Sequence, residues 1–353
     1  MRPSNFARKL LSWYSENLRD LPWRRTKDPY HILVSEIMLQ QTQVERVKEY
    51  YLRWIEEFPD ITTLATADGE TVLSQWEGLG YYSRAKNLHK ACIQLNDEQR
   101  AIPDSLEELT ALPGIGPYTA AAVLSIAFNK DEPLVDANVE RVFARFYNIN
   151  HPVKSREARK IFWKKAHDLL PSGLAGDFNQ ALMELGALIC LKTNPLCAAC
   201  PVNAGCRAYD LNLVDQRPVP SPRKKTIQIT MACGVLKKDN LFFIQKRQKN
   251  DVWADLWEFP GGRLKEGEKP EDAVVREIKE ETELDVHKIR PIKSVQHSYM
   301  NYRVTLHGFF CDQKKKEQRP VLHAAQECRW VSREELDDFA FPAGHRKLIK
   351  LLK

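Results

Sequence analysis

Apolar residues recur at helical spacing through the first two hundred residues of the chain. Residues 6–14 show this periodicity, and residues 32–58 continue it up to Pro59. An alanine-rich stretch at residues 120–128 and an apolar stretch at residues 178–189 have the same character. The pattern predicts helices joined by short turns, and therefore an all-α N-terminal region.

The pattern changes after Cys206. Residues 217–226 carry three prolines and four cationic side chains, which is typical of a basic, semi-rigid linker. Strands around one or two helices follow the linker, which indicates a separate α+β domain at 227–353 beside a helical domain at 1–216. The predicted elements of this second domain are strands at 227–236, 241–245 and 302–310, a helix at 271–281 and a basic helix over the last dozen residues.

The length of 353 residues agrees with two domains that each bury a core. Lys and Arg outnumber Asp and Glu by 53 to 47, and the net charge of +6 is compatible with nucleic acid without requiring it. The first 25 residues lack an apolar core of the signal-peptide type, and no apolar stretch approaches the length of a membrane span. We expect a soluble, cytoplasmic protein with no membrane partner.

Four cysteines close the helical region. Cys190, Cys197, Cys200 and Cys206 are separated by six, two and five residues, so their thiolates can surround one metal centre. Tetrahedral zinc is one candidate, although zinc sites more often combine two Cys-x2-Cys pairs and this set contains one. The spacing favours a [4Fe–4S] cluster over zinc, and both over a disulfide framework.

A glycine-containing turn, Leu112-Pro113-Gly114-Ile115-Gly116, precedes the alanine-rich helix. Its glycines permit a positive φ and the close approach of another backbone, and the following helix start can offer amides to a phosphate. An ordinary helix–helix turn is the alternative for this segment alone. Because the cysteine set follows, we interpret Leu112, Gly114 and Gly116 as DNA-phosphate contacts, which would position a duplex without reading its sequence.

These features belong to a longer series of specific segments. The segments are residues 21–24 (LPWR), 35–43 (SEIMLQQTQ), 78–82 (GLGYY), 112–116 (LPGIG), 135–139 (VDANV) and the four cysteines. With them, residues 20–206 resemble the helix-hairpin-helix, iron–sulfur DNA glycosylases related to endonuclease III, and within that group the adenine DNA glycosylases of the MutY type. The resemblance implies a helix-hairpin-helix domain in which residues 1–25 and about 131–216 form the cluster-bearing half.

Two carboxylates in these segments can divide the work of breaking an N-glycosidic bond. Glu36, flanked by Ile37 and Met38, is predicted to have a raised pKa, to protonate the departing base and later to activate water. Asp136, twenty residues after Gly116, is predicted to stay ionised and to stabilise an oxocarbenium-like sugar. Taken singly, Glu36 reads as a solvated helix residue and Asp136 as a helix N-cap. Their joint occurrence in two matching segments favours catalysis.

The resemblance also implies roles for other residues. Tyr118 and Asn138 would flank the carboxylates, Trp23, Arg24, Leu39 and Gln180 would line the adenine pocket, and Gln41, Thr42 and Tyr81 would wedge at the opposite base. Core packing is the alternative for Trp23 and Tyr81. Relatives that also cut the DNA backbone carry a Schiff-base lysine two residues after the hairpin, and Tyr118 occupies that position here. We therefore expect release of the base without strand cleavage.

A second motif begins at Gly262 in the C-terminal domain. Glu268 follows after five residues, and residues 276–284 (REIKEETEL) come after seven more. This spacing resembles the Nudix box, Gx5Ex7REUxEExGU, of hydrolases such as MutT. Glu283 departs from it, because the box has glycine at that position.

The acidic residues of this box suggest a magnesium site. Glu277, Glu280 and Glu281 lie at i, i+3 and i+4, so one helix face presents three carboxylates, which suits Mg²⁺ and a pyrophosphate substrate. We expect Gly261 to add a backbone carbonyl and Arg276 to orient the glutamates. A solvated acidic helix is the alternative.

In relatives of the MutY type, the C-terminal domain helps to detect 8-oxoguanine opposite adenine. The family's Phe-Ser-His loop for the oxidised base aligns with Tyr299-Met300-Asn301, which follows His297. Met300 cannot hydrogen-bond as a serine does, and this departure puts side-chain recognition of the lesion in doubt.

The leading hypothesis is a monofunctional adenine DNA glycosylase of base excision repair that acts on adenine opposite 8-oxoguanine or guanine. Its expected partner is double-stranded DNA, and we expect a monomer at the nucleoid of a bacterial cytoplasm. One alternative is a nucleotide pyrophosphohydrolase of the 8-oxo-dGTP type, alone or in addition. Another is a cluster-bearing DNA-binding module without catalysis, against which the presence of both Glu36 and Asp136 argues.

Overall fold

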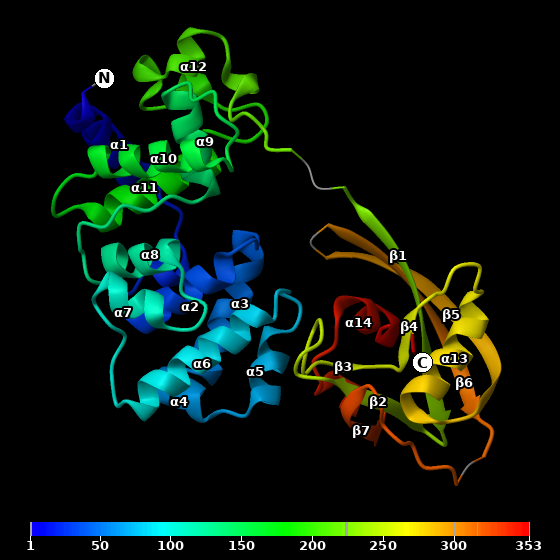
Figure 1. The fold of residues 1–353 in the computed structure, drawn as a ribbon. Coiled ribbons are helices and arrows are strands. Elements are labelled where there is room, and N and C mark those ends of the chain that lie inside the picture. Colours follow the sequence, from blue (N-terminus) through cyan, green and yellow to red (C-terminus); the bar gives the residue numbers. More distant parts are fainter. Residues whose placement is uncertain (1, 223–224, 300, 316, 353) are drawn as a thin grey trace. The chain divides into compact units, whose positions relative to one another are not determined.

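The computed structural model describes residues 2–222, 225–299, 301–315 and 317–352. The chain forms two compact units, one of helices and one built on a β-sheet (Figure 1). The first unit comprises Met1–Ala67 and Lys86–Arg223, and the second comprises Asp68–Ala85 and Lys224–Lys353. One segment from the helical part of the sequence therefore belongs to the unit that contains the sheet. In the described ranges, no helix has the length and apolar character needed to cross a membrane.

Twelve α-helices occur in the described residues before the sheet, and six of them begin at a side-chain cap. Asp28, Asp60, Ser105 and Ser155 accept hydrogen bonds from first-turn amides, which satisfies donors that have no partner within the helix. The helices are α1 (Pro3–Asn17), α2 (Pro29–Leu39), α3 (Val44–Glu57), α4 (Ile61–Thr66), α5 (Gly69–Trp76), α6 (Ser83–Asp97), α7 (Leu106–Ala111), α8 (Pro117–Ala127), α9 (Ala137–Phe146), α10 (Arg156–Leu169), α11 (Ala175–Leu188) and α12 (Arg207–Asp210). The predicted all-α character of this region is confirmed.

Helix α11 lies at the centre of the first unit, where it packs against α1, α8 and α9. Its side chains are buried on several sides, and Phe178 contributes to a cluster of aromatic rings with Phe6 and Phe146. Burial of large aromatic side chains is the main stabilising contribution to such a core. The same helix carries polar residues toward the cavity described below.

The continuous helical pattern at residues 32–58 is divided into two helices. Helix α2 ends at Leu39 and α3 begins at Val44, and the backbone at Gln41 is left-handed with φ of 57°. Four polar residues at 40–43 interrupt the apolar repeat, and a left-handed residue cannot continue a right-handed helix. The helical periodicity at 32–58 therefore covers two helices, and a turn projects residues 40–43 between them.

The second unit is built on a seven-stranded sheet with the order β3-β2-β1-β6-β5, in which β4 pairs with β1 and β7 pairs with β2. Strands β1 and β6 are parallel and the other pairs are antiparallel. The elements are β1 (Ile227–Lys238), β2 (Leu241–Arg247), β3 (Trp257–Glu258), β4 (Gly261–Arg263), α13 (Pro270–Thr282), β5 (Val286–Tyr299), β6 (Tyr302–Gln313), β7 (Ala325–Val331) and α14 (Ala343–Ile349). This confirms the predicted α+β character.

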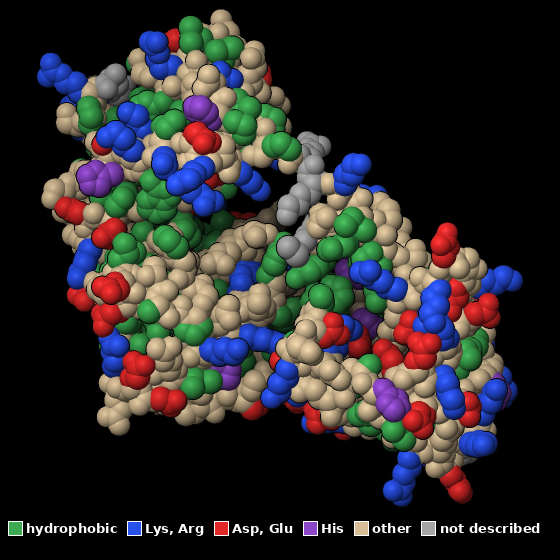
Figure 2. All heavy atoms as spheres, viewed as in Figure 1, with side chains coloured by type: hydrophobic (Ala, Val, Ile, Leu, Met, Phe, Trp, Pro, Cys, Tyr) green, Lys and Arg blue, Asp and Glu red, His purple; other side chains and the backbone are tan. Residues whose placement is uncertain are grey.

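Alternation along β1 divides the core of the second unit into two layers. Cys233 and Val235 face a cluster that contains Leu348 of α14, whereas Ala232 and Leu236 face a cluster that contains Ile278 of α13. The two helices therefore cover opposite faces of the sheet. On the outer surface of this unit, acidic and basic side chains are intermixed in the view of Figure 2.

The segment Asp68–Ala85 is joined to α14 and the loop before it by specific polar contacts. Glu77 accepts hydrogen bonds from Arg346 Nε at 2.8 Å and Nη2 at 2.7 Å, and also from the Phe341 amide at 3.1 Å. The Tyr82 hydroxyl donates to the Phe341 carbonyl at 3.1 Å. The Phe341 amide is thus bound by Glu77, and the Phe341 carbonyl is bound by Tyr82 of the GLGYY segment.

Candidate active site

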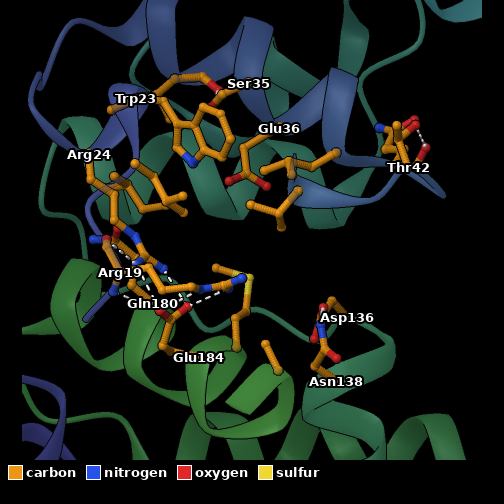
Figure 3. Close-up of a pocket in the computed structure, with 18 of the residues that line it drawn as sticks. Arg19, Trp23, Arg24, Ser35, Glu36, Thr42, Asp136, Asn138, Gln180 and Glu184 are labelled. Atoms are coloured by element: carbon orange, nitrogen blue, oxygen red, sulfur yellow. Dashed lines mark hydrogen bonds and ion pairs between the residues drawn. The ribbon is translucent and has the colours of Figure 1, made fainter. Parts of the chain in front are cut away.

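A cavity of about 340 Å³ opens in the first unit (Figure 3). Side chains from α2, α8, α9 and α11 line it, together with the short helical turn Pro22–Arg24. The cavity brings together ten residues that the sequence predicted for catalysis or base binding. They are Trp23, Arg24, Glu36, Leu39, Gln41, Thr42, Tyr118, Asp136, Asn138 and Gln180.

Glu36 reaches the cavity from a buried position on α2 and is 4% exposed. Burial raises its pKa to about 7, and the nearby Asp136 adds to this rise. The Tyr118 hydroxyl opposes it, because it donates a hydrogen bond to Glu36 Oε2 at 2.7 Å and so favours the ionised carboxylate. The expected rise in pKa is confirmed, and Glu36 can hold or release a proton near neutral pH.

Asp136 lines the cavity at the start of α9, across from Glu36 (Figure 3). One of its oxygens accepts from the Val139 amide at 2.7 Å and the other from Asn138 Nδ2 at 2.8 Å. Burial raises the pKa of Asp136, and these hydrogen bonds to the ionised form oppose the rise. Asp136 is therefore the N-cap of α9, as the alternative reading of the sequence held, and it also lines the cavity.

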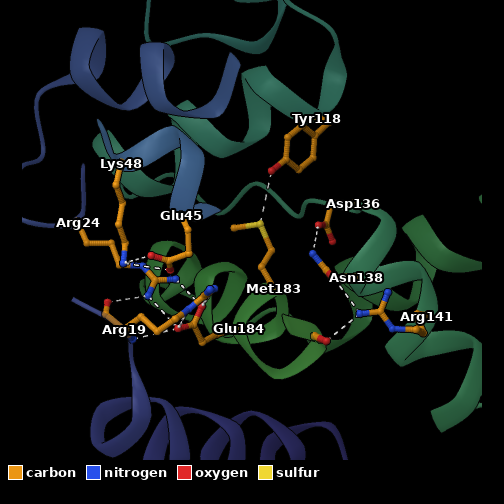
Figure 4. A network of polar contacts seen from close by, with 11 residues as sticks. Arg19, Arg24, Glu45, Lys48, Tyr118, Asp136, Asn138, Arg141, Met183 and Glu184 are labelled. Carbon is orange, nitrogen blue, oxygen red and sulfur yellow. Dashed lines mark hydrogen bonds and ion pairs between the residues drawn. The ribbon is translucent and has the colours of Figure 1, made fainter. Parts of the chain in front are cut away.

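Asn138 is held in place by a further contact. Its Oδ1 accepts from Arg141 Nη2 at 2.8 Å, and the same guanidinium nitrogen donates to the Gly186 carbonyl at 2.7 Å (Figure 4). This chain of hydrogen bonds runs from α11 through Arg141 and Asn138 to the Asp136 carboxylate. It fixes which amide edge of Asn138 faces Asp136.

A buried carboxylate, Glu184, forms a further wall of the same cavity together with Arg19 and Arg24. Arg19 donates to it from its backbone amide, Nε and Nη2, and Arg24 donates from both terminal nitrogens, at 2.8–3.1 Å (Figure 4). Burial alone raises the pKa of Glu184, but the bonds from the two arginines outweigh burial and lower it to about 2. This cluster places fixed charges and hydrogen-bonding edges beside the space for a ligand.

Sequence reasoning missed Arg19 and Glu184. Glu184 lies four residues after Gln180 on the predicted helix at 178–189, so both project from one helix face. That spacing was the available signal. Arg19 lies in the loop after α1, outside every segment that was singled out.

Trp23 combines the two roles proposed for it. It is buried and its ring packs edge-on against Tyr51, with centroids 5.4 Å apart, yet it also lines the cavity. Tyr81 belongs to the second unit and is not among the residues that line the cavity.

The glycine turn precedes α8 as expected. Gly114 has φ of 77°, and a Cβ at this position would lie 2.5 Å from the Asn87 Cβ, so a side chain is excluded. Gly116 is the N-cap residue of α8 and is exposed, and Pro117 occupies the first turn. The Ile115 amide donates to the Leu112 carbonyl within the turn, whereas Gly114 and Gly116 are exposed and the start of α8 has no side-chain cap.

The four cysteines Cys190, Cys197, Cys200 and Cys206 line one small cavity and all are free thiols. Burial raises the pKa of Cys200 to about 12, and the neighbouring cysteines contribute to that rise. Arg145 is buried beside them and approaches the Cys190 sulfur with Nη1 at 3.3 Å. A set of four soft donors around one space, with a cation against it, fits an iron–sulfur cluster.

The predicted magnesium site is not supported. Arg276 binds Glu277 at 2.7 Å and Glu280 at 3.0 Å, and it also binds Glu268. Glu281 instead points inward, where it accepts from the Gly261 amide and Gln245. Within the described ranges, no group of three acidic side chains is gathered closely enough to hold a metal ion.

The backbone at Glu283, where the box has glycine, is left-handed. Glu283 caps α13 with φ of 58°, and its amide donates to the Lys279 carbonyl at 3.0 Å. The structure also explains why the box begins with glycine at position 262. A Cβ at this position would lie 2.4 Å from the Glu277 carboxylate.

The predicted lesion-reading loop lies between β5 and β6. His297 and Tyr299 are on β5, and Asn301 follows, donating to the Lys225 carbonyl at 3.3 Å. Met300 lies outside the described residues.

Two known protein families match this chain, one in each part of the sequence. Residues 34–167 match the HhH-GPD superfamily of base excision DNA repair proteins, and residues 231–351 match the NUDIX domain. A solved thermostable thymine-DNA glycosylase is 31% identical with a TM-score of 0.55, covering 59% of this chain and 97% of that chain. A non-covalent complex of endonuclease III with DNA is 21% identical with a TM-score of 0.52, covering 60% and 99%, and supports the fold. The fold and site thus define a helix-hairpin-helix base excision glycosylase with an added Nudix-like domain.

Relatives identify the particular family. The adenine DNA glycosylase of Buchnera aphidicola subsp. Baizongia pistaciae is 40% identical over 72% of this chain and 73% of its own length. The adenine DNA glycosylase of Homo sapiens is 31% identical over 98% of this chain and 73% of its own length. The chain belongs to the adenine DNA glycosylase family.

Proposed function

We propose that this protein is a monofunctional adenine DNA glycosylase of base excision repair, which hydrolyses the N-glycosidic bond of adenine opposite 8-oxoguanine or guanine. The observation that carries the proposal is the pair Glu36 and Asp136, which face one cavity from opposite sides. Burial raises the pKa of both carboxyl groups, and the hydrogen bonds from Asn138 and the Val139 amide favour the ionised form of Asp136.

The first step is departure of the base. Protonated Glu36 gives its proton to a ring nitrogen of adenine, and the electrons of the N-glycosidic bond move onto the base as that bond breaks. Asp136 stabilises the positive charge that develops on the sugar, and Asn138 and the Val139 amide hold its carboxylate in position.

The second step is addition of water. Glu36, now a carboxylate, removes a proton from water as the oxygen bonds to C1′ of the sugar, which restores protonated Glu36. The product is an abasic site in an intact strand. Tyr118 supports this outcome, because a phenol bound to Glu36 stands where a Schiff-base lysine would be needed for strand cleavage.

The wall formed by Arg19, Arg24 and Glu184 is suited to hold the extruded adenine. Adenine presents both donors and acceptors on its edges, and this wall offers guanidinium donors and a carboxylate acceptor fixed by mutual bonds. Trp23, Leu39 and Gln180 complete the pocket. Extrusion of the base costs a few kcal/mol, which these contacts offset.

The remaining DNA contacts follow from the turns. Gln41 and Thr42 lie in the left-handed turn after α2, where they can insert at the opposite base. Tyr81, in the second unit, is a further residue proposed to wedge at that base. The turn at Leu112, Gly114 and Gly116, in which the two glycines are exposed, would bind a backbone phosphate. Double-stranded DNA is therefore the proposed partner of a monomeric protein at the bacterial nucleoid.

We also propose a [4Fe–4S] cluster on Cys190, Cys197, Cys200 and Cys206. When bound, it would supply a structural crosslink to the segment after α11. Arg145 would hold that segment independently, because it donates to the carbonyls of Leu191, Lys192, Val214 and Arg217.

The test is incubation with end-labelled duplexes that contain adenine opposite 8-oxoguanine, guanine or thymine, with and without alkali. Strand breaks should appear after alkali with 8-oxoguanine and guanine, and neither without alkali nor with thymine. Glu36→Gln and Asp136→Asn should each abolish turnover while they retain binding. Efficient cleavage without alkali, or near-wild-type rates in either variant, would contradict the proposal.

A further inference from the structure

We propose that Trp253 is a specificity-determining residue of this enzyme. It forms an aromatic site with Tyr81 and Tyr299 that stacks on a purine base opposite the target adenine. The inference rests on the proposed function and extends it to a residue outside the catalytic cavity. All of the residues involved belong to the second unit.

The rings come from three separate segments and meet at one place. The Tyr81 and Tyr299 centroids are 6.0 Å apart with an interplanar angle of 40°, and those of Trp253 and Tyr299 are 5.3 Å apart at 65°. Trp253 also packs on His297 at 5.8 Å. All four side chains are partly exposed, so ring surface remains accessible to another planar group.

The two outer rings are held in unusual backbone conformations. Tyr81 has φ of 49° and Trp253 has φ of 60°, and Asp255 beside it has φ of 62°. Left-handed backbone is sterically unfavourable for an L-residue, and bulky residues adopt it rarely. Such conformations persist where the surroundings determine them, and they concentrate at functional sites.

On the Tyr81 side, the turn is braced by buried groups. Arg84 donates to the carbonyls of Leu79 at 3.2 Å and Gly80 at 3.0 Å, and Trp76 Nε1 donates to the Gly80 carbonyl at 3.1 Å. The Arg84 guanidinium also lies over the Tyr81 ring, 5.6 Å from its centroid. The ring is therefore presented by a rigid turn.

The turn between β2 and β3 is braced in a similar way. Arg247 Nε donates to the Val252 carbonyl at 2.8 Å, and Gln326 Nε2 donates to Asp255 Oδ1 at 2.8 Å. The Leu256 amide closes the turn onto the Trp253 carbonyl at 3.2 Å. Trp253 thus occupies a fixed position although its ring is partly exposed.

Stacking on aromatic side chains explains a preference for purines. A base stacked on an aromatic ring contributes about 1–3 kcal/mol, and every base offers a π-face. A purine overlaps more ring surface than thymine does. Trp253 is therefore expected to favour 8-oxoguanine and guanine over thymine opposite adenine.

The experiment measures binding on a Glu36→Gln background, so that adenine stays in place. The duplexes carry adenine opposite 8-oxoguanine, guanine, thymine or an abasic-site analogue. Trp253→Ala should weaken binding to the two purine duplexes by about tenfold, which is the lower part of the stacking range. Binding to the abasic duplex should change less than twofold, because no base is present to stack.

Matched variants separate stacking from folding. Trp253→Phe should keep most of the purine preference, and Trp253→Leu, which preserves bulk without an aromatic ring, should lose it as Trp253→Ala does. Val252→Ala should bind all four duplexes as the background protein does, because Val252 is an exposed neighbour (53%) outside the ring cluster. If Trp253→Ala does not fold, the comparison of Leu with Phe decides the question.

Two outcomes overturn the inference: an equal loss of binding to all four duplexes, or no loss with either Trp253→Ala or Trp253→Leu. The failure of the proposed function looks different. In that case the otherwise wild-type protein releases no adenine from any duplex, whereas failure of this inference leaves release intact and purine preference unchanged in the Trp253 variants.

Discussion

Glu36 shows how one residue acquires a catalytic property from its surroundings. A glutamate in water is ionised at neutral pH, but burial on α2 and the charge of Asp136 raise the Glu36 pKa to about 7. The Tyr118 hydroxyl limits the rise, because its hydrogen bond favours the ionised form. Tyr118 therefore sets the pH range in which Glu36 can act as an acid.

This balance predicts the pH dependence of adenine release. The single-turnover rate should fall as pH rises through about 7, because the protonated form of Glu36 is lost. Tyr118→Phe removes a hydrogen bond that lowers the Glu36 pKa, so the descending limb should move to higher pH. Rates measured from pH 5 to 9 check this. A limb that stays in place or moves to lower pH would show that Tyr118 does not tune Glu36.

At the level of elements, helix α13 illustrates a local departure from a motif. Glu283 adopts the left-handed C-cap conformation that glycine adopts without strain. The strain is small compared with the stability of a domain, and the helix forms with Glu283 in place. Hydrogen bonds to the Glu283 carbonyl from Lys279 and Gln318 help to hold this end.

Glu283→Gly and Glu283→Ala form a matched pair that measures this strain. Both remove the contact with His323, but only glycine relieves the left-handed backbone. The glycine variant should be more stable than the alanine variant by about 1 kcal/mol. The midpoint of chemical unfolding of the sheet-containing unit provides the measurement. A less stable glycine variant would mean that the cap is not strained.

The segment after α11 gives the second prediction at this scale. Protein produced with sufficient iron should contain about four irons per chain and absorb visible light. Cys197→Ala should lower both iron content and soluble yield, because a ligand is lost. Cys328→Ala is the control, since Cys328 lies on β7 and is not part of the four-cysteine cavity. Stoichiometric zinc without iron or sulfide would contradict the assignment.

The sequence predicted elements with strong local patterns well, and it did not predict features that depend on tertiary contacts. Strong periodicity and specific motifs identified α8, α11, α13 and β1 with nearly their observed bounds. The break between α2 and α3 escaped it, because polar residues at 40–43 can lie on the exposed side of a helix as easily as in a turn. Glu184 and Arg19 escaped it because their role depends on a tertiary contact. The magnesium prediction is not supported, because periodicity places carboxylates on one face without specifying their partners.

The whole molecule couples distant parts of the sequence within one unit. Asp68–Ala85 lies far from the sheet in sequence, yet it shares a unit with the sheet. The ion pair between Glu77 and Arg346 is one cause, because both side chains are only about one-sixth exposed (16% and 17%). Tyr81 is carried by this segment, so the pair supports the position of an aromatic ring near Tyr299.

A double-mutant cycle with Glu77→Ala and Arg346→Ala tests this coupling. Each single change leaves a largely buried charge without its main partner, so each should be destabilising. The double variant should lose less than the sum, with a coupling free energy of about 1–3 kcal/mol in chemical unfolding. Additive losses would show that the pair does not join the segment to the sheet.

The central claim is that Glu36 and Asp136 hydrolyse the bond between adenine and its sugar. Its most direct test is single-turnover chromatography of free adenine released from a duplex with adenine opposite 8-oxoguanine. The wild type should release one adenine for each abasic site formed, without strand cleavage. Glu36→Gln should reduce the rate at least a hundredfold while the duplex remains bound. Free adenine released by Glu36→Gln at the wild-type rate would contradict the account.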